Sequence, residues 1–189
     1  MLKKNHLAVN FTAGLALYAG TQLLKANQQL PLHDFAVKAD ALFFAGQHNR
    51  YIDLAIYLFI FVVAGILPDF DEKLPFWKHR GFSHSIWIPF FTFVIGYVFK
   101  VPQILAFSLG YFWHILIDSF SVRGIDWFYP IGRGTIKYTS GAQITRGHFF
   151  GIYHTGKFSE YIVLLVISAV NIAIIYMWFN AILQGRIQL

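Results

Sequence analysis

The chain has 189 residues, of which 57% are hydrophobic and only 13% are charged, and its formal net charge is +6. Soluble domains average about 25% charged residues, so a water-soluble protein of this length could not cover so much apolar surface. The absence of cysteine excludes a disulfide framework and a thiolate metal site. Composition therefore predicts an integral membrane protein in contact with membrane lipids.

Five apolar segments come near the ~20 residues that a helix needs to span a bilayer. The third is short, and Pro89 lies in its first turns, where proline is tolerated better than in mid-helix. We expect an all-α, polytopic membrane helical bundle with about five transmembrane helices, folded as a single integral membrane domain over residues 1–189. The predicted helices cover residues 6–24, 51–67, 84–99, 101–120 and 160–183.

The first segment has a signal peptide as its alternative, because Lys3 and Lys4 precede it. However, the segment carries His6, Asn10 and Thr12 at its start, and no clear small-residue cleavage site follows it. These features favour a retained helix.

Two connections between the predicted helices differ in composition from the apolar segments. Between the first two helices, apolar residues recur near helical spacing, which indicates an interfacial helix over residues 33–46, although an ordinary loop fits nearly as well. Residues 121–157 form the longest polar stretch and are rich in glycine. This second composition is typical of an ordered loop or a partly mobile lid.

Loop charges predict the orientation of the chain. With five crossings, the N-terminus, the 68–83 loop and the 121–157 loop share one side, which holds most of the basic residues. Because Lys and Arg collect in cytoplasmic loops, we expect the N-terminus in the cytoplasm, the chain in the inner (plasma) membrane, and no nucleic-acid partner. The basic residues of this side are Lys3, Lys4, Lys73, Lys78, Arg80, Arg123, Arg133, Lys137, Arg146 and Lys157, against Lys25, Lys38, Arg50, Lys100 and Arg186.

Ionisable residues of several helices are predicted to meet at the cytoplasmic end. The fourth helix rises ~1.5 Å per residue, which puts His114 ~20 Å and Asp118 ~26 Å from its outer end. Four residues apart, these two share a helix face, as paired metal ligands do in zinc enzymes. Asp69 and Asp71 follow the second helix, where Pro68 disfavours further helix, and they project to one side if the chain is extended there.

Further groups belong to the same end: His6 begins the first helix, and His79, Arg80 and His84 precede the third. Each feature alone has a structural alternative. The histidine and aspartate of the fourth helix could form a hydrogen-bonded pair, and the two acids after the proline could be a solvated helix end. Ser83 or Ser85 could cap the third helix, and Arg80 could be a basic residue that anchors the loop on the cytoplasmic side. Their joint placement favours a metal site. Ionisable groups at membrane depth cost about 2.5–3.5 kcal/mol on insertion scales, and coordination to a cation offsets that cost.

The stretches "GILPDFD", "HRGFSHS" and "HILID" together resemble the YdjM-like family, described as LexA-binding, inner membrane-associated metal-dependent hydrolases. Ser83 replaces the more usual Thr of the family pattern and keeps its hydroxyl. The resemblance covers about residues 1–135 and leaves out the tail with His148 and His154. The residues that match are His6, Pro68, Asp69, Asp71, His79, Arg80, Gly81, Ser83, His84, Ser85, His114, Asp118 and Pro130.

The resemblance implies a metal-dependent hydrolase in the membrane, and the loop charges predict that its site faces the cytoplasm. One or two divalent ions, of zinc, manganese or iron, would be held by Asp69, His84, His114 and Asp118, with His6, Asp71 and His79 as further ligands or their supports. Arg80 would grip a phosphate, Ser83 would donate a hydrogen bond, and Asp71 or His79 would act as acid or base. We favour a phosphoester of a lipid or another amphiphile as the substrate.

Two other classes of protein remain open. A transporter of metal ions or protons would spread its ionisable groups through the bilayer depth. A non-catalytic membrane interaction protein would need no histidines at ligand spacing. The sequence also leaves open whether His148 and His154 reach the site or lie at the interface, and whether the chain forms a homo-oligomer.

Overall fold

The described part of the chain is mainly helical. The computed structural model describes residues 3–44, 49–73, 81–121, 125–130, 154 and 156–187, and no β-sheet occurs among them. Each of the five predicted apolar segments contains a helix. The elements are α1 (Lys3–Ala26), α2 (His33–Ala39), the π-helical turn η1 (Asp40–Phe44), α3 (Arg50–Ala64), the 3₁₀ turns η2 (Leu67–Lys73) and η3 (Phe82–His84), α4 (Trp87–Phe99), α5 (Pro102–Ser119) and α6 (Phe158–Leu183).

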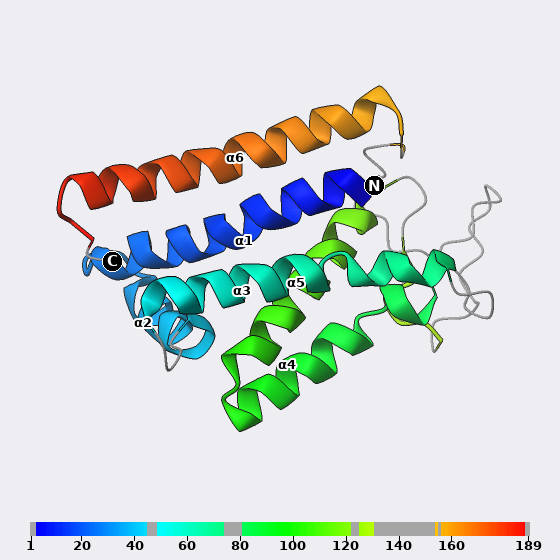
Figure 1. Cartoon of the computed structure of the whole chain (residues 1–189), viewed down its shortest axis with the longest axis horizontal. Helices are drawn as coiled ribbons and strands as arrows, with labels where there is room; N and C mark the ends of the chain where they lie inside the picture. Colours follow the sequence, from blue (N-terminus) through cyan, green and yellow to red (C-terminus); the bar gives the residue numbers. More distant parts are fainter. Residues whose placement is uncertain are drawn as a thin grey trace.

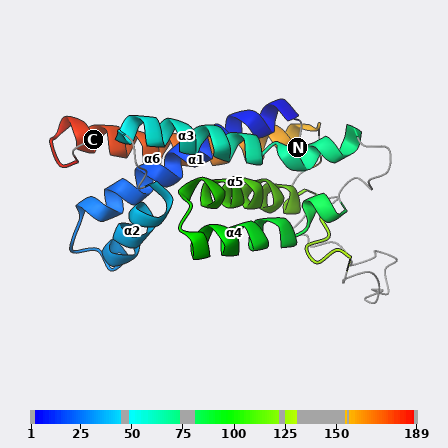
Figure 2. The same cartoon turned by 60° about the horizontal axis from the view of Figure 1, so that its bottom comes forward.

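Figure 1 shows α1, α3 and α6 running in roughly the same direction, with α4 and α5 inclined to them. Among the described helices, α5 has the most buried residues. Helices α3 and α4 both pack along α5, while α6 packs along α1 on the other side of the bundle. Figure 2 shows α1, α3 and α6 in one layer and α4 and α5 in a second, with α2 at one end. This order explains why α6 keeps most of its apolar side chains exposed, as expected of a helix that faces lipid.

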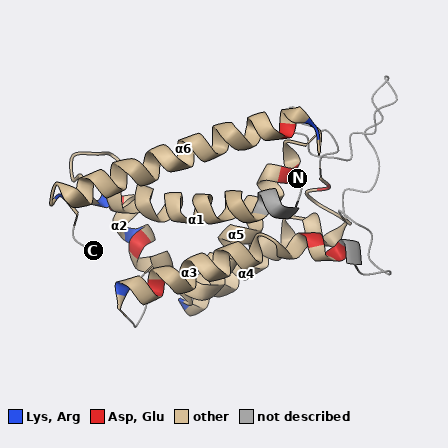
Figure 3. Ribbon diagram, turned by 45° about the horizontal axis from the view of Figure 1, so that its top comes forward, with Lys and Arg blue, Asp and Glu red and all other residues tan. Residues whose placement is uncertain are grey.

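Among the residues that the structure describes, three helical stretches are long and apolar enough to cross a membrane: residues 7–26, 50–71 and 158–183. Helix α4 is apolar but has 13 residues, which correspond to ~20 Å, less than the ~30 Å thickness of a hydrocarbon core. The all-helical membrane architecture is therefore confirmed, whereas the count of about five crossings stays a prediction. Figure 3 shows the charged residues near the ends of the helices, as membrane residence requires.

Close contact between α3 and α5 fixes the position of the polar residues of α5 along the bundle. A β-carbon at Gly110 would overlap the backbone carbonyl of Phe61, so only glycine allows this approach. One turn further along both helices, Nδ1 of His114 lies 2.7 Å from the carbonyl oxygen of Gly65. The glycine contact thus sets the register that brings His114 to the end of α3.

Two details at the polar end differ from possibilities that the sequence left open. Asp69 and Asp71 lie in a 3₁₀ turn rather than in extended chain: α3 ends at Ala64, before Pro68, and η2 begins at Leu67. Neither Ser83 nor Ser85 caps the third membrane helix: α4 begins after Ile86, without a side-chain cap. The hydroxyl of Ser85 instead donates to the carbonyl oxygen of Phe82.

The predicted interfacial segment is helical over its described residues, as α2 and η1. An ion network joins it to α1 and α3, since Asp40 lies 2.6 Å from Nζ of Lys25 and 3.4 Å from Nη2 of Arg50. Gln22 donates to the same carboxylate. Residues 45–46 of this segment, and most of the predicted 121–157 loop, lie outside the described residues.

Candidate metal centre

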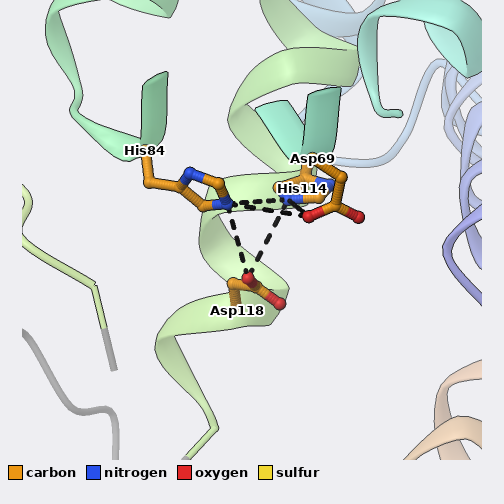
Figure 4. A group of neighbouring side chains, drawn as sticks. All are labelled: Asp69, His84, His114 and Asp118. Atoms are coloured by element: carbon orange, nitrogen blue, oxygen red, sulfur yellow. Dashed lines mark hydrogen bonds and ion pairs between the residues drawn. The ribbon is translucent and has the colours of Figure 1, made fainter. Parts of the chain in front are cut away.

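Four buried side chains from three elements converge at one end of the bundle. Asp69 comes from η2, His84 from η3, and His114 and Asp118 from successive turns of α5. One nitrogen or oxygen of each lies within 4.8 Å of the other three. Figure 4 shows these four side chains pointing toward a common centre.

The spacing of the four atoms fits ligands around one cation better than a set of direct hydrogen bonds. Nε2 of His114 lies 3.6 Å from Asp69 Oδ1 and 3.9 Å from Asp118 Oδ2. Nε2 of His84 lies 3.8 Å and 3.7 Å from the same two oxygens, and 3.4 Å from Nε2 of His114. Tetrahedral ligands at the ~2.0–2.2 Å typical of zinc lie about 3.3–3.6 Å apart. The observed spacing is equal or slightly wider, so one divalent ion fits.

The second nitrogen of His114 is engaged by the backbone. Its Nδ1 lies 2.7 Å from the Gly65 carbonyl oxygen, which can only accept a hydrogen bond. Nδ1 therefore carries the proton, and Nε2 presents a lone pair to the centre. Metal-bound histidines usually have such a partner on the opposite nitrogen, which fixes the tautomer and the ring orientation.

His84 is held in the same way by side chains. Its Nδ1 lies 3.3 Å from Asp71 Oδ2 and 3.1 Å from Ser83 Oγ, and the Ser83 hydroxyl donates to Asp71. The hydroxyl of Tyr111 donates to the backbone carbonyl of Ser83 at 2.7 Å, which anchors this turn on α5. Asp71 was predicted as a ligand and a catalytic group; the structure places it outside the four-residue group, against the far nitrogen of His84.

Electrostatics at His84 favour positive charge in the centre. Burial alone lowers the pKa of His84, but hydrogen bonds to Asp69 and Asp71 and the charge of Asp118 outweigh it, so the pKa is raised above its usual value. The same carboxylates that attract a proton would attract a metal cation. A proton and a cation therefore compete for this centre.

The remaining predicted residues are not all described. His79, Arg80 and His148 lie outside the described residues, and of His6 only the backbone, in α1, is described. His154 is exposed, and its backbone N–H donates to Ser159 Oγ at the start of α6.

Comparison with known proteins identifies the family of the chain. The family model described as the YdjM inner membrane protein matches residues 1–184. The chain belongs to the YdjM inner membrane protein family. No curated protein and no solved structure matches the chain.

Membership of the YdjM family confirms the predicted resemblance and a place in the inner membrane. The predicted extent of about 1–135 was too short, because the match runs on through α6. The short motifs lie before residue 131, whereas α6 is almost uniformly apolar and contains no short motif that could be recognised by inspection.

Glu160 and Asn10 are among the buried polar residues of this YdjM-family chain that were not selected as site residues from the sequence. Glu160, in the first turn of α6, is fully buried and accepts a hydrogen bond from the backbone N–H of Gly156 at 2.6 Å. An acid at this position of a helix stabilises its positive N-terminal end. Asn10, in α1, is also fully buried. It was noted only as a polar residue near the chain start, and the signal missed was an amide within an otherwise apolar helix.

Proposed function

We propose that this protein is a membrane-embedded, metal-dependent hydrolase that cleaves a phosphoester of a lipid or another amphiphile. One observation carries the proposal: two Nε2 atoms and two carboxylate oxygens, from Asp69, His84, His114 and Asp118, converge within 4.8 Å of one another in a buried site. Zinc, manganese and iron accept mixed imidazole and carboxylate ligands.

The residues around the centre support a catalytic role more than they support simple ion storage. A divalent ion held there would lower the pKa of a bound water toward ~7 and polarise a phosphoryl oxygen. Asp71 and the Gly65 carbonyl keep both imidazoles protonated on Nδ1, so that each Nε2 faces the centre. Four protein ligands leave room for water when the ion takes five or six partners, as manganese and iron do and as zinc does in some transition states.

Asp71 is suited to proton handling because it lies beside the centre without belonging to the ligand group. Its carboxylate lies within 3.3 Å of His84 Nδ1 and accepts the hydroxyl proton of Ser83. A carboxylate so placed stabilises positive charge on the imidazole while charge shifts in the centre. We assign it this supporting role rather than metal ligation.

The position of the site in the bundle favours an amphiphilic substrate. The ligands lie where η2, η3 and the last turns of α5 meet, at the end of the membrane-crossing stretch of residues 50–71. The head group of a lipid lies at that level of a bilayer. The predicted cytoplasmic N-terminus would place this end at the inner leaflet, and Arg80, predicted from the sequence, would supply a positive charge for phosphate.

Metal analysis and hydrolysis of the purified protein in detergent test the proposal together. We expect about one zinc, manganese or iron ion per chain, and metal-dependent cleavage of p-nitrophenyl phosphate, of bis-p-nitrophenyl phosphate or of phospholipid vesicles. Chelation should abolish cleavage, and return of the ion should restore it. Asp69→Ala and His114→Ala should lose both the ion and the activity while Asp34→Asn, in the exposed helix α2, keeps both.

Two results would overturn the proposal. If wild-type protein holds no stoichiometric ion, the four-residue group is not a metal centre. If it holds the ion but cleaves none of these phosphoesters, while metal ions cross proteoliposomes that contain it, the site serves transport instead.

A further inference from the structure

Asn10 of α1 is a buried amide without an evident structural reason. Its exposed fraction is 0%, and neither Oδ1 nor Nδ2 has a hydrogen-bond partner within the part of the chain that the structure describes. Burying an amide without partners costs about 1–3 kcal/mol in proteins. An apolar side chain of similar size would avoid that cost, so the polarity of Asn10 calls for a function.

The amide is connected to the candidate metal centre through one shared residue, Gly65. A β-carbon at Gly65 would overlap Asn10 Nδ2, so the amide packs directly on the α-carbon of Gly65. The carbonyl oxygen of the same glycine holds Nδ1 of the ligand His114 at 2.7 Å. Helix α1 therefore places one polar group against Gly65, the residue whose carbonyl oxygen holds the ring of His114.

A second buried amide shows what a purely structural asparagine looks like here. Asn171 of α6 has an exposed fraction of 6%, and its Nδ2 donates to Thr12 Oγ1 of α1 at 3.1 Å. This pair joins two membrane helices in the usual way. Asn10 lies on the same helix as Thr12 but forms no such bond, so helix association does not explain it.

We propose that the Asn10 carboxamide is a binding contact for the phosphoryl group of the substrate, with Nδ2–H donating to a phosphoryl oxygen beside the metal centre. The inference rests on the proposed function, since a phosphate would approach Asp69 and Asp118 only with a cation between them. A neutral amide suits this position: it offers two N–H donors to an anion and, unlike Lys or Arg, does not repel the cation. It therefore adds affinity for phosphate without lowering affinity for the metal.

The test separates phosphate binding from metal binding. Manganese-loaded protein in detergent is titrated with inorganic phosphate, and separately with micelles that contain phosphatidic acid, by calorimetry and by ³¹P line broadening. Asn10→Leu should keep one ion per chain and equal or higher thermal stability, yet bind phosphate at least tenfold more weakly. Asn10→Asp should keep the metal and also weaken phosphate binding, through charge repulsion. Binding of both probes would indicate recognition of the phosphate alone, and binding of phosphatidic acid alone would indicate the lipid head group.

Asn171→Leu is the matched control. It removes a buried amide of equal size that already has a partner, so it should lower stability and leave phosphate affinity unchanged. Equal phosphate affinity in wild type, Asn10→Leu and Asn10→Asp would overturn the inference while leaving the hydrolase proposal intact. Loss of the metal in both Asn10 variants, or wild-type metal content and cleavage with no phosphate binding, would overturn it too. Absence of metal from wild type would instead remove the proposed function itself.

Discussion

The two ends of the bundle gather charged residues in different ways. At the end with η1, Asp40 is contacted directly by Lys25 at 2.6 Å and by Arg50 at 3.4 Å, and both cations keep 37% of their side-chain surface exposed. At the opposite end, the Nε2 atoms of His84 and His114 lie 3.4 Å from each other and 3.6–3.9 Å from the two carboxylate oxygens, and both histidine side chains are fully enclosed.

This difference separates a structural ion network from a candidate metal centre. Around Asp40, side-chain donors of the protein contact the carboxylate acceptor directly. These contacts are short and need no additional ion. At the other end, the facing atoms are two imidazole lone pairs and two carboxylate oxygens, all of which attract positive charge. Their common spacing from one another, rather than their number, is what indicates a cation.

The largest effect is expected from removing a ligand. His114→Ala deletes one of four donor atoms and leaves the Gly65 carbonyl without its N–H donor. Purified His114→Ala should contain almost no stoichiometric metal by mass spectrometry, whereas Asp40→Asn at the other end should contain as much as wild type. Equal metal content in both variants would mean that the two ends do not differ in the way described.

Helix register should matter almost as much, because α5 carries two ligands. Gly110→Ala places a methyl group against the Phe61 carbonyl, which forces α3 and α5 apart. Such overpacking costs about 1–3 kcal/mol, and displacement of His114 from Gly65 should weaken metal binding about 10–100-fold. Competition with a fluorescent chelator measures the affinity.

Gly20→Ala is the control for this variant, since a β-carbon at Gly20 meets only Ile174 Cγ2 at 3.8 Å, an ordinary contact. It should leave both stability and metal affinity close to wild type. Unchanged metal affinity in Gly110→Ala would show that the centre does not depend on the register of α3 and α5.

A smaller loss is expected when Asp71 is neutralised. Asp71→Asn keeps the size of the side chain but removes the charge that faces Nδ1 of His84. We expect metal affinity to fall about tenfold, at the low end for partners of metal ligands, with little change in melting temperature. Asp34→Asn, an exposed acid of α2, controls for the loss of one negative charge. A complete loss of metal in Asp71→Asn would make Asp71 a ligand after all.

The sequence could predict that His114 and Asp118 of α5 lie together because helical geometry is regular. The spacing of His114 and Asp118 fixes a shared face whatever the tertiary structure. The segment around Pro68 was harder, since proline disfavours an α-helix at the preceding residue but does not choose between an extended chain and a 3₁₀ turn. Only packing against η3 and α5 makes that choice.

The sequence likewise could not predict that Asp69 and Asp71 take different positions in the site. Both acids follow Pro68, and both were predicted as ligands. In the 3₁₀ turn Asp69 faces the four-residue group, while Asp71 faces Nδ1 of His84. Two residues of chain separate them, and the tertiary position of η3 decides which one reaches the centre. Asn10 was overlooked for a similar reason, because its neighbour Gly65 lies more than fifty residues away in the chain.

The smallest effect is expected at the Asp40 network, and it concerns stability alone. Asp40→Asn removes the charge that Lys25 and Arg50 contact, but both cations are more than a third exposed, so solvent already screens the pairs. The loss should be about 1 kcal/mol or less, or roughly 2–4 °C in melting temperature for a chain of this size. Thermal unfolding in detergent, with Asp34→Asn beside it, measures the shift. Since this network lies at the end of the bundle opposite to the ligands, metal content should stay constant; a change would show that α2 and η1 reach the centre through the helices between them.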